Sequence, residues 1–212
     1  MSIEYLMIVI VFDMDGTLIA ESSWELLHEY FQADAKKVRE NRQLYFSGRI
    51  DYETWMEKDI QLWDSPTMGD IREGLSHYTI EPFAKEVVAQ LKAKGAIPCI
   101  VSSGIDILAH LVGKTLGIEL KLVFANTFTV FDGNVKGICN VEPYKKDTIV
   151  RKLSQLLSVP LQEFAAVGDA APDVSLFRAV SLKLAYNPKD HIIAEAADYV
   201  LGDLRELLTH CF

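Results

Sequence analysis

The sequence has 212 residues, of which half are hydrophobic and 24% are charged. This length and composition predict an ordered globular protein with one medium domain, or one domain carrying an insertion, and exclude a disordered or fibrous chain. The formal net charge of −9 argues against a nucleic-acid-binding protein, which needs a basic face to neutralise phosphates. Cys99, Cys139 and Cys211 are scattered without a C-x-x-C pair, which favours a reducing cytoplasmic location over a disulfide framework or a zinc site.

The most apolar stretch of the chain, residues 6–12, is too short to cross a bilayer and predicts no association with a membrane. Residues 8–12 are rich in β-branched side chains and lack polar alternation. This pattern is typical of a parallel strand that is covered on both faces.

The spacing of apolar residues predicts helices over residues 24–78. Trp24, Leu27 and Phe31, and later Tyr52 and Trp55, recur at spacings near 3.6, and turn signals separate the helical segments. All three tryptophans lie in this stretch, where packing of a small subdomain is their ordinary role. The pattern predicts an all-helical cap over residues 20–80, inserted into a core formed by residues 1–19 and 81–212.

From residue 81 onward, strands alternate with helices. This alternation predicts an α/β fold with a doubly wound, Rossmann-like parallel sheet, whose ligand site lies at the carboxyl ends of the strands. The predicted helices are 82–94, 105–116, 145–157 and 172–180; the predicted strands are 97–101, 122–125, 164–167 and 182–185, with a hairpin at 128–131 and 135–138.

Two carboxylates follow the first predicted strand. Residues two apart in extended backbone point the same way, so Asp13 and Asp15 can converge on one ligand, and Gly16 permits a tight exit. Carboxylates this close repel each other unless a cation lies between them, and a hard divalent ion with oxygen ligands resolves the conflict. The alternative interpretation is an ordinary acidic turn.

A serine pair and a lysine pair lie at predicted helix starts. Ser102 and Ser103 follow strand 97–101 and precede a helix, whose unpaired N–H groups can hold a phosphate; serines at such a place are more often ordinary helix caps. Lys145 and Lys146 begin a helix, where a cation is locally unfavourable and therefore indicates an anionic partner, unless the pair is simply solvated.

The last acidic pair again follows a predicted strand. Asp169 emerges after Gly168, and Asp173 lies in the first turn of the next helix, where it also compensates the helix dipole. Four weak signals at strand ends or helix starts together indicate one phosphate site.

The DMDGT segment at residues 13–17, followed in order by Ser102, a lysine, Asp169 and Asp173, resembles the haloacid dehalogenase (HAD) superfamily of phosphatases. The helical insertion after the first motif is similar to that of the phosphoserine phosphatase group. The resemblance spans residues 7–201. It implies a phosphomonoester hydrolase in which Asp13 is the nucleophile and Asp15 the general acid and base.

The resemblance also implies a Mg²⁺ cofactor, held by Asp13, Asp169 and the backbone carbonyl of Asp15, with support from Asp173. Ser102, Lys146 and the amides of Ser103 and Gly104 are implied to bind the phosphoryl oxygens. Lys146 is preferred to Lys145 because it aligns better ahead of the apolar helical residues, by a small margin.

Three positions depart from the phosphoserine phosphatase pattern. Pro172 stands where that group commonly has asparagine. The glutamate that binds the substrate amino group corresponds by spacing to Ser22, with Glu21 one place away, and the arginine that holds the carboxylate corresponds to Asp59. We therefore expect catalysis to be retained and phosphoserine to be a poor substrate.

Several alternatives remain open from the sequence. The substrate can be a sugar phosphate or phosphoglycolate, and a phosphomutase shares the same first step. A dehalogenase is disfavoured because Asp15 is present. A phosphonatase needs a Schiff-base lysine in its insertion, and nothing singles out Lys58 for that role. A non-catalytic phosphate-binding regulator is disfavoured because no catalytic position is lost. The expected partner is a small phosphate ester, with the chain a monomer or homodimer.

Overall fold

The computed structural model describes residues 8–212, which form one seven-stranded sheet in the order β4-β3-β2-β1-β5-β6-β7. Only the β3–β4 pair is antiparallel within these residues. Residues 1–7 of the predicted core, including the start of the apolar stretch 6–12, lie outside the described residues. The strands are β1 (Val9–Phe12), β2 (Ile97–Ile105), β3 (Val123–Phe131), β4 (Asn134–Ile138), β5 (Phe164–Gly168), β6 (Leu182–Tyr186) and β7 (Tyr199–Leu201).

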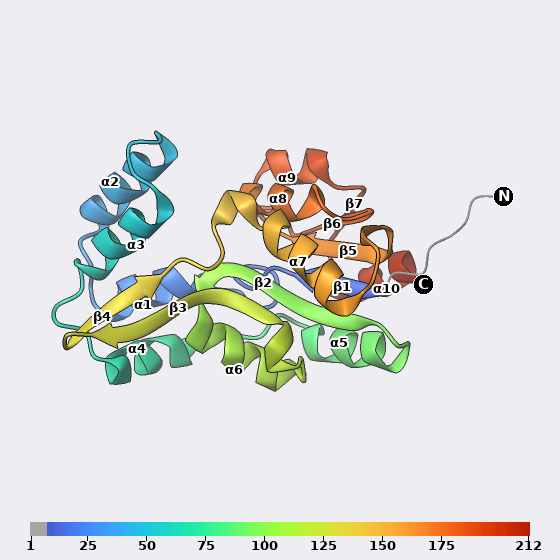
Figure 1. The fold of residues 1–212 in the computed structure, drawn as a ribbon, viewed down its shortest axis with the longest axis horizontal. Coiled ribbons are helices and arrows are strands. Elements are labelled where there is room, and N and C mark those ends of the chain that lie inside the picture. The colour runs from blue at the N-terminus through green and yellow to red at the C-terminus, as the bar shows by residue number, and fades with distance from the viewer. Residues whose placement is uncertain (1–7) are drawn as a thin grey trace.

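Helices cover both faces of the sheet, as Figure 1 shows, with α5 and α6 on one side and α7, α8 and α9 on the other. The predicted α/β fold with a doubly wound sheet is therefore confirmed. The helices are α1 (Ser23–Tyr30), α2 (Ala35–Phe46), α3 (Tyr52–Ile60), α4 (Met68–Gly74), α5 (Ala84–Ala93), α6 (Asp106–Leu116), α7 (Asp147–Leu157), α8 (Val174–Phe177), α9 (His191–Ala196) and α10 (Leu207–Cys211).

Strand β1 forms the centre of the core. All four of its side chains are buried, because β2 and β5 flank it and helices cover both faces. The chain runs from β1 to β2 and β3 on one side, then returns to β5, β6 and β7 on the other. The topological switch point, where ligands bind in such sheets, therefore lies at the carboxyl ends of β1 and β5.

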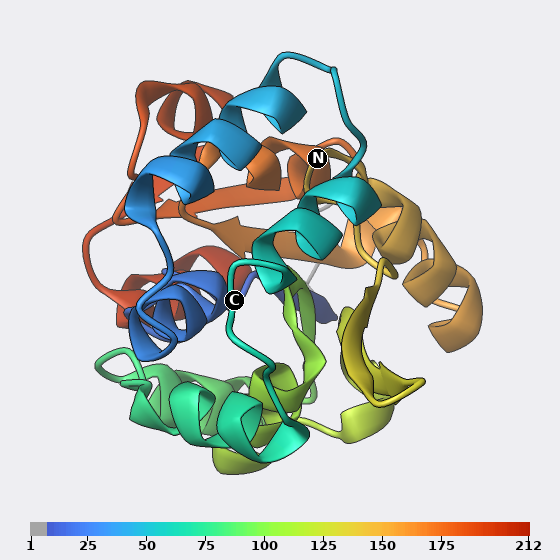
Figure 2. The same cartoon turned by 90° about the vertical axis from the view of Figure 1, so that its left-hand side faces the viewer.

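The helices of residues 20–80 fall into two groups. Helix α4 packs on α1, which also contacts β2, whereas α2 packs on α3 and buries none of its own side chains. Figures 1 and 2 show α2 and α3 standing apart from the layer that contains α4 and α6. The division of the chain into a core and a cap at residues 20 and 80 stays a prediction.

Several predicted boundaries need correction. Strand β2 continues to Ile105, so Ser102, Ser103 and Gly104 lie within the strand, and helix α6 begins only at Asp106. A register shift against β3 between Val101 and Ile105 accommodates the three small residues. The predicted strands 122–125 and 128–131 form the single strand β3.

Two helix starts also differ from their predictions. A short 3₁₀ turn, Pro143–Lys145, precedes α7, so Lys146 lies at the junction of the two helices. A second turn, Ala171–Asp173, precedes the short helix α8, which ends at Phe177. Within residues 8–212, no helix has the length and hydrophobicity needed to cross a membrane.

Candidate active site

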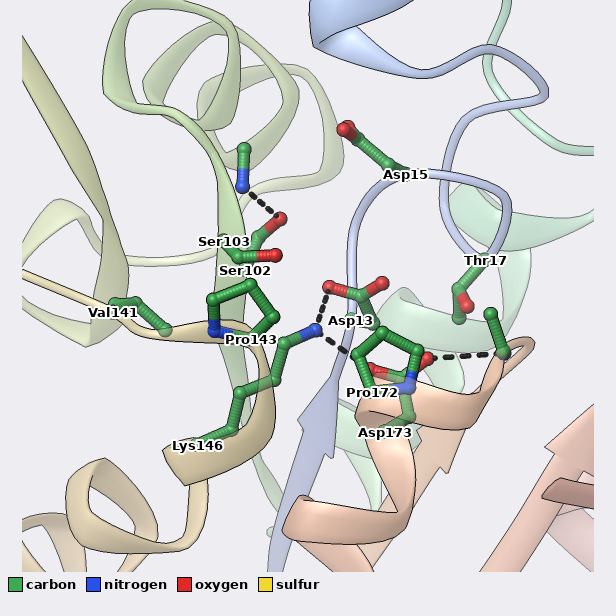
Figure 3. A network of polar contacts seen from close by, with 12 residues as sticks. Asp13, Asp15, Thr17, Ser102, Ser103, Val141, Pro143, Lys146, Pro172 and Asp173 are labelled. Carbon is green, nitrogen blue, oxygen red and sulfur yellow. Dashed lines mark hydrogen bonds and ion pairs between the residues drawn. The ribbon is translucent and has the colours of Figure 1, made fainter. Parts of the chain in front are cut away.

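A buried lysine, Lys146, links the acid that follows β1 to an acid that follows β5. Lys146 is 1% exposed, and its Nζ lies 2.8 Å from Asp13 Oδ1 and 2.6 Å from Asp173 Oδ1 (Figure 3). Burial lowers the pKa of Lys146, but the two carboxylates outweigh it and raise this pKa above its usual range. The geometry favours Lys146 over Lys145, which is exposed and pairs with Glu142.

Asp169 faces Asp13 from the end of β5. Its Oδ1 accepts a hydrogen bond from Thr17 Oγ1 at 3.1 Å, and Lys189 Nζ lies 2.9 Å from its Oδ2. Gly16 adopts φ +82°, and a Cβ at that position would collide with both Asp169 Oδ2 and Lys189 Nζ. Glycine is therefore required by the backbone conformation and by the close approach of two side chains.

Asp173 fixes the turn after β5. Its Oδ2 accepts hydrogen bonds from the backbone N–H groups of Asp169, at 3.1 Å, and Ala170, at 3.2 Å. Its Oδ1 is occupied by Lys146. Because both oxygens are already engaged, Asp173 orients Asp169 and Lys146 in this structure.

The three buried carboxylates Asp13, Asp169 and Asp173 fit a hard cation, because ligand oxygens of all three lie within 4.8 Å of one another. Burial raises the pKa of each, and that of Asp173 reaches about 6, although Lys146 opposes the shift for Asp13 and Asp173. Three acids held this close favour a positive charge among them. Oxygen donors of this kind suit a hard divalent cation.

Asp15 sits beside this cluster but is held differently. Its Oδ2 accepts hydrogen bonds from the Ser23 N–H at 2.9 Å and the Ser23 hydroxyl at 2.7 Å. Its Oδ1 is buried and has no hydrogen-bond partner within residues 8–212. Burial and the nearby charge of Asp13 raise the pKa of Asp15 to about 7. A carboxyl group with this pKa can both donate and accept a proton near neutral pH.

The small residues of β2 close the site from the other side. The Ser102 hydroxyl accepts a hydrogen bond from the Gly104 N–H at 3.0 Å, which leaves its own proton free to donate. Ser103 and Gly104 line the cavity above Asp13. A Cβ at Gly104 would lie 2.9 Å from Asp15 Oδ2, so glycine allows β2 to approach the acid closely.

The cavity has a volume of about 260 Å³ and extends from these acids to helices α1, α2 and α3. Ser22 and Asp59 both line it. Glu21 does not: its carboxylate accepts a hydrogen bond from the Thr79 N–H at 2.8 Å, which joins the two chain segments that enter and leave the helical stretch.

Sequence reasoning missed Lys189, Thr17 and Ser23. Lys189 follows strand β6, so the rule that functional groups lie at the carboxyl ends of strands would have found it. Thr17 follows Asp13 by four residues and Ser23 follows Asp15 by eight, but their hydrogen bonds depend on how the chain turns after Gly16. No spacing rule predicts that turn.

The fold and the site together define a Rossmann-like α/β enzyme whose acidic groups meet at the ends of β1 and β5. The chain belongs to the haloacid dehalogenase-like hydrolase family, whose model matches residues 7–180. This confirms the family resemblance.

Two phosphoserine phosphatases of other organisms are similar in sequence over more than 90% of both chains. The phosphoserine phosphatase of Methanocaldococcus jannaschii is 30% identical, covering 95% of this chain and 96% of its own; that of Idiomarina loihiensis is 29% identical, covering 94% and 91%. A solved phospho-aspartyl intermediate analogue of a phosphoserine phosphatase aligns with a TM-score of 0.81 and 27% identity, covering 96% and 98% of the two chains. These similarities confirm a hydrolase of the HAD phosphatase type.

Proposed function

We propose that this chain hydrolyses a small phosphate monoester in a Mg²⁺-dependent reaction that passes through an aspartyl-phosphate on Asp13. The observation that supports this most strongly is the pairing of two unlike acids. The Asp13 carboxylate pairs with the Lys146 ammonium at 2.8 Å, which opposes the rise that burial causes in the pKa of Asp13. The neighbouring Asp15 pairs with no lysine or arginine within residues 8–212, accepts hydrogen bonds from Ser23 instead, and has a pKa of about 7. Two acids with separated roles are what a two-step displacement requires.

In the first step an Asp13 oxygen attacks phosphorus, and the bond from phosphorus to the leaving oxygen breaks. Asp15 gives its proton to the departing alkoxide. Because Ser23 occupies Oδ2, the proton is placed on Oδ1, the oxygen without a partner in the described part of the chain. In the second step Asp15 accepts a proton from water, the water oxygen bonds to phosphorus, and the Asp13–phosphorus bond breaks.

Charge on the transferring group is stabilised by donors that surround it. Lys146 Nζ has three N–H bonds, of which two contact Asp13 and Asp173, so one remains for a phosphoryl oxygen. The Ser102 hydroxyl, whose proton is free, and the Ser103 N–H add neutral donors, whereas the Gly104 N–H already donates to Ser102 Oγ. Asp13 and Asp169 would hold Mg²⁺, whose charge would offset that of the phosphoryl oxygens.

The named relatives suggest phosphoserine as a substrate, but the cavity argues against it. Ser22 and Asp59, both in the lining, stand at the positions that the sequence assigned to an acid for the amino group and an arginine for the carboxylate. Asp59 therefore places a negative charge where phosphoserine needs a positive one. We therefore propose a small phosphate ester other than phosphoserine, and we keep the prediction of a cytoplasmic monomer or homodimer.

The test is a screen of phosphomonoesters with Mg²⁺, including phosphoserine, phosphoglycolate, sugar phosphates and an aryl phosphate, in the wild type and in Asp13→Asn. Hydrolysis by the wild type alone supports the proposal. Equal hydrolysis by both proteins would refute it.

A further inference from the structure

The leaving alcohol of the substrate must lie in the part of the cavity formed by α1, α2 and α3, because the phosphoryl group is held at Asp13. This part, which we call the head pocket, is lined by Trp24, Arg42, Tyr45, Tyr52, Trp55 and Asp59, among others. Its side chains therefore determine which alcohol is accepted. The inference below rests on the proposed function.

Three aromatic rings form one wall of the head pocket. Tyr45 stacks on Trp55 with ring centroids 4.8 Å apart, and Tyr52 meets Trp55 edge-on at 5.6 Å. Tyr52 is fixed further by a 2.8 Å hydrogen bond from its hydroxyl to the Ser103 carbonyl. Rings held in place by one another present preorganised π-systems, which attract cations, quaternary ammonium groups in particular.

A buried carboxylate completes the pocket. Asp59 is 3% exposed; Asn41 Nδ2 donates to its Oδ1 at 2.8 Å, and His28 Nε2 lies 3.3 Å from its Oδ2. Trp63 Nε1 donates to His28 Nδ1 at 3.2 Å, so this nitrogen must keep its lone pair and the imidazole carries one proton, on Nε2. Both partners of Asp59 are then neutral.

No lysine or arginine within residues 8–212 pairs with Asp59. A buried carboxylate with only neutral partners is costly, and a cation that arrives with the substrate would reduce the cost. Arg42 also lines the pocket, but it is exposed and its guanidinium lies over the Phe46 ring, 5.4 Å from the centroid. Its charge is therefore screened by solvent, whereas that of Asp59 is not.

We propose that the head pocket selects the phosphate monoester of a small cationic amino alcohol, with an alkylated or quaternary ammonium head and no carboxylate. The head lies against Tyr45, Tyr52 and Trp55, and its charge is compensated by Asp59. A carboxylate on the same head is repelled by Asp59. This assigns Asp59 a binding role through its own charge, and it explains why an acid occupies a buried position in α3.

The experiment compares phosphocholine with its uncharged carbon isostere, in which a tert-butyl group replaces trimethylammonium. The two esters have nearly the same shape, so the ratio of their kcat/KM values isolates the charge of the head. We expect phosphocholine to be favoured about tenfold or more, and phosphoserine to be poorer than phosphocholine. A ratio of one or below, or a preference for phosphoserine, overturns the inference.

Variants test whether the head pocket determines the ratio of kcat/KM values for phosphocholine and its uncharged isostere. Asp59→Asn should bring it close to one, while Glu57→Gln, an exposed acid on the same helix outside this cavity, should preserve it. Trp55→Leu, which keeps Asp59, should lower the ratio severalfold and provides the test if Asp59→Asn does not fold. A ratio that survives these changes contradicts the assignment.

A binding measurement separates the inference from the proposed function. Calorimetry of both esters with Asp13→Asn and Mg²⁺ gives their affinity ratio without turnover. If the wild type hydrolyses none of the esters, the proposed function fails, whereas the affinity ratio still decides the selectivity. Tighter binding of phosphocholine supports the inference, and equal or weaker binding overturns it.

Discussion

Replacing Lys146 with methionine tests the electrostatics of the site directly. Methionine has a similar length, so Lys146→Met removes the ammonium without leaving a large cavity. Lys146 Nζ lies within 2.8 Å of Asp13 and 2.6 Å of Asp173, and it is the only lysine or arginine in the described chain that pairs with either. Breaking a buried ion pair by removing one partner costs about 3–5 kcal/mol. For a domain of this size, that lowers Tm by about 6–20 °C.

The loss of thermal stability in Lys146→Met should depend on the pH and on the presence of Mg²⁺. Because burial raises the pKa of Asp13, Asp169 and Asp173 in the folded protein, and that of Asp173 to about 6, the folded state binds more protons than the unfolded chain above the ordinary value of 3.8. Stability from these groups is therefore greatest at low pH and falls as pH rises through this window. In Lys146→Met, which lacks the opposing ammonium, stability should fall more steeply as pH rises, and Mg²⁺ should restore part of it.

The assay is thermal unfolding followed by circular dichroism at pH 5 and pH 8, with and without Mg²⁺. Lys145→Met is the matched control, because that lysine is exposed and pairs only with Glu142. An unchanged Tm for Lys146→Met at pH 8, or a larger loss at pH 5 than at pH 8, would refute the assignment of Lys146 as the counter-charge.

Four further outcomes are expected. Asp13→Asn should abolish turnover and keep the fold, which kinetics and circular dichroism check together; wild-type activity would exclude covalent catalysis. EDTA should stop hydrolysis and Mg²⁺ restore it, and Asp169→Ala should raise the Mg²⁺ requirement sharply; full activity in EDTA would refute a metal role. Ser22→Glu/Asp59→Arg should improve kcat/KM for phosphoserine about ten- to a hundredfold, since a charged hydrogen bond contributes roughly 1.5–3 kcal/mol; no gain would show that these positions are misassigned. We expect the helices of residues 20–80 to close over the site when a phosphate mimic binds, which should slow their hydrogen exchange; unchanged exchange would count against this closure.

The sheet was predictable because its strands are short apolar runs separated by clear turn signals. The acidic residues were predictable because each follows such a run, and parallel topology brings their side chains to one edge. The extension of β2 through Ser102, Ser103 and Gly104 was not, since small polar residues after a strand usually indicate a turn. Pairing with β3 and the close approach of Asp15 fix this segment instead.

The head pocket lay beyond the reach of sequence patterns. Helical periodicity places Trp55 and Asp59 on one face of α3, but it does not reveal that His28 and Asn41, from α1 and α2, converge on Asp59. Nor does it distinguish aromatic residues that line a cavity from those that only pack the interior. Trp63 stacks with Phe31, whereas Trp55 stacks with Tyr45 at the cavity wall.

The central claim is the covalent bond between phosphorus and Asp13, and chemical trapping during turnover measures it most directly. The enzyme is mixed with substrate and Mg²⁺, quenched in acid and reduced with borohydride, which converts an acyl phosphate to the alcohol, and the digest is sequenced by mass spectrometry. We predict reduction at position 13, dependent on substrate and absent in Asp13→Asn. Continued turnover with an unmodified Asp13, or modification at another residue, would contradict the account.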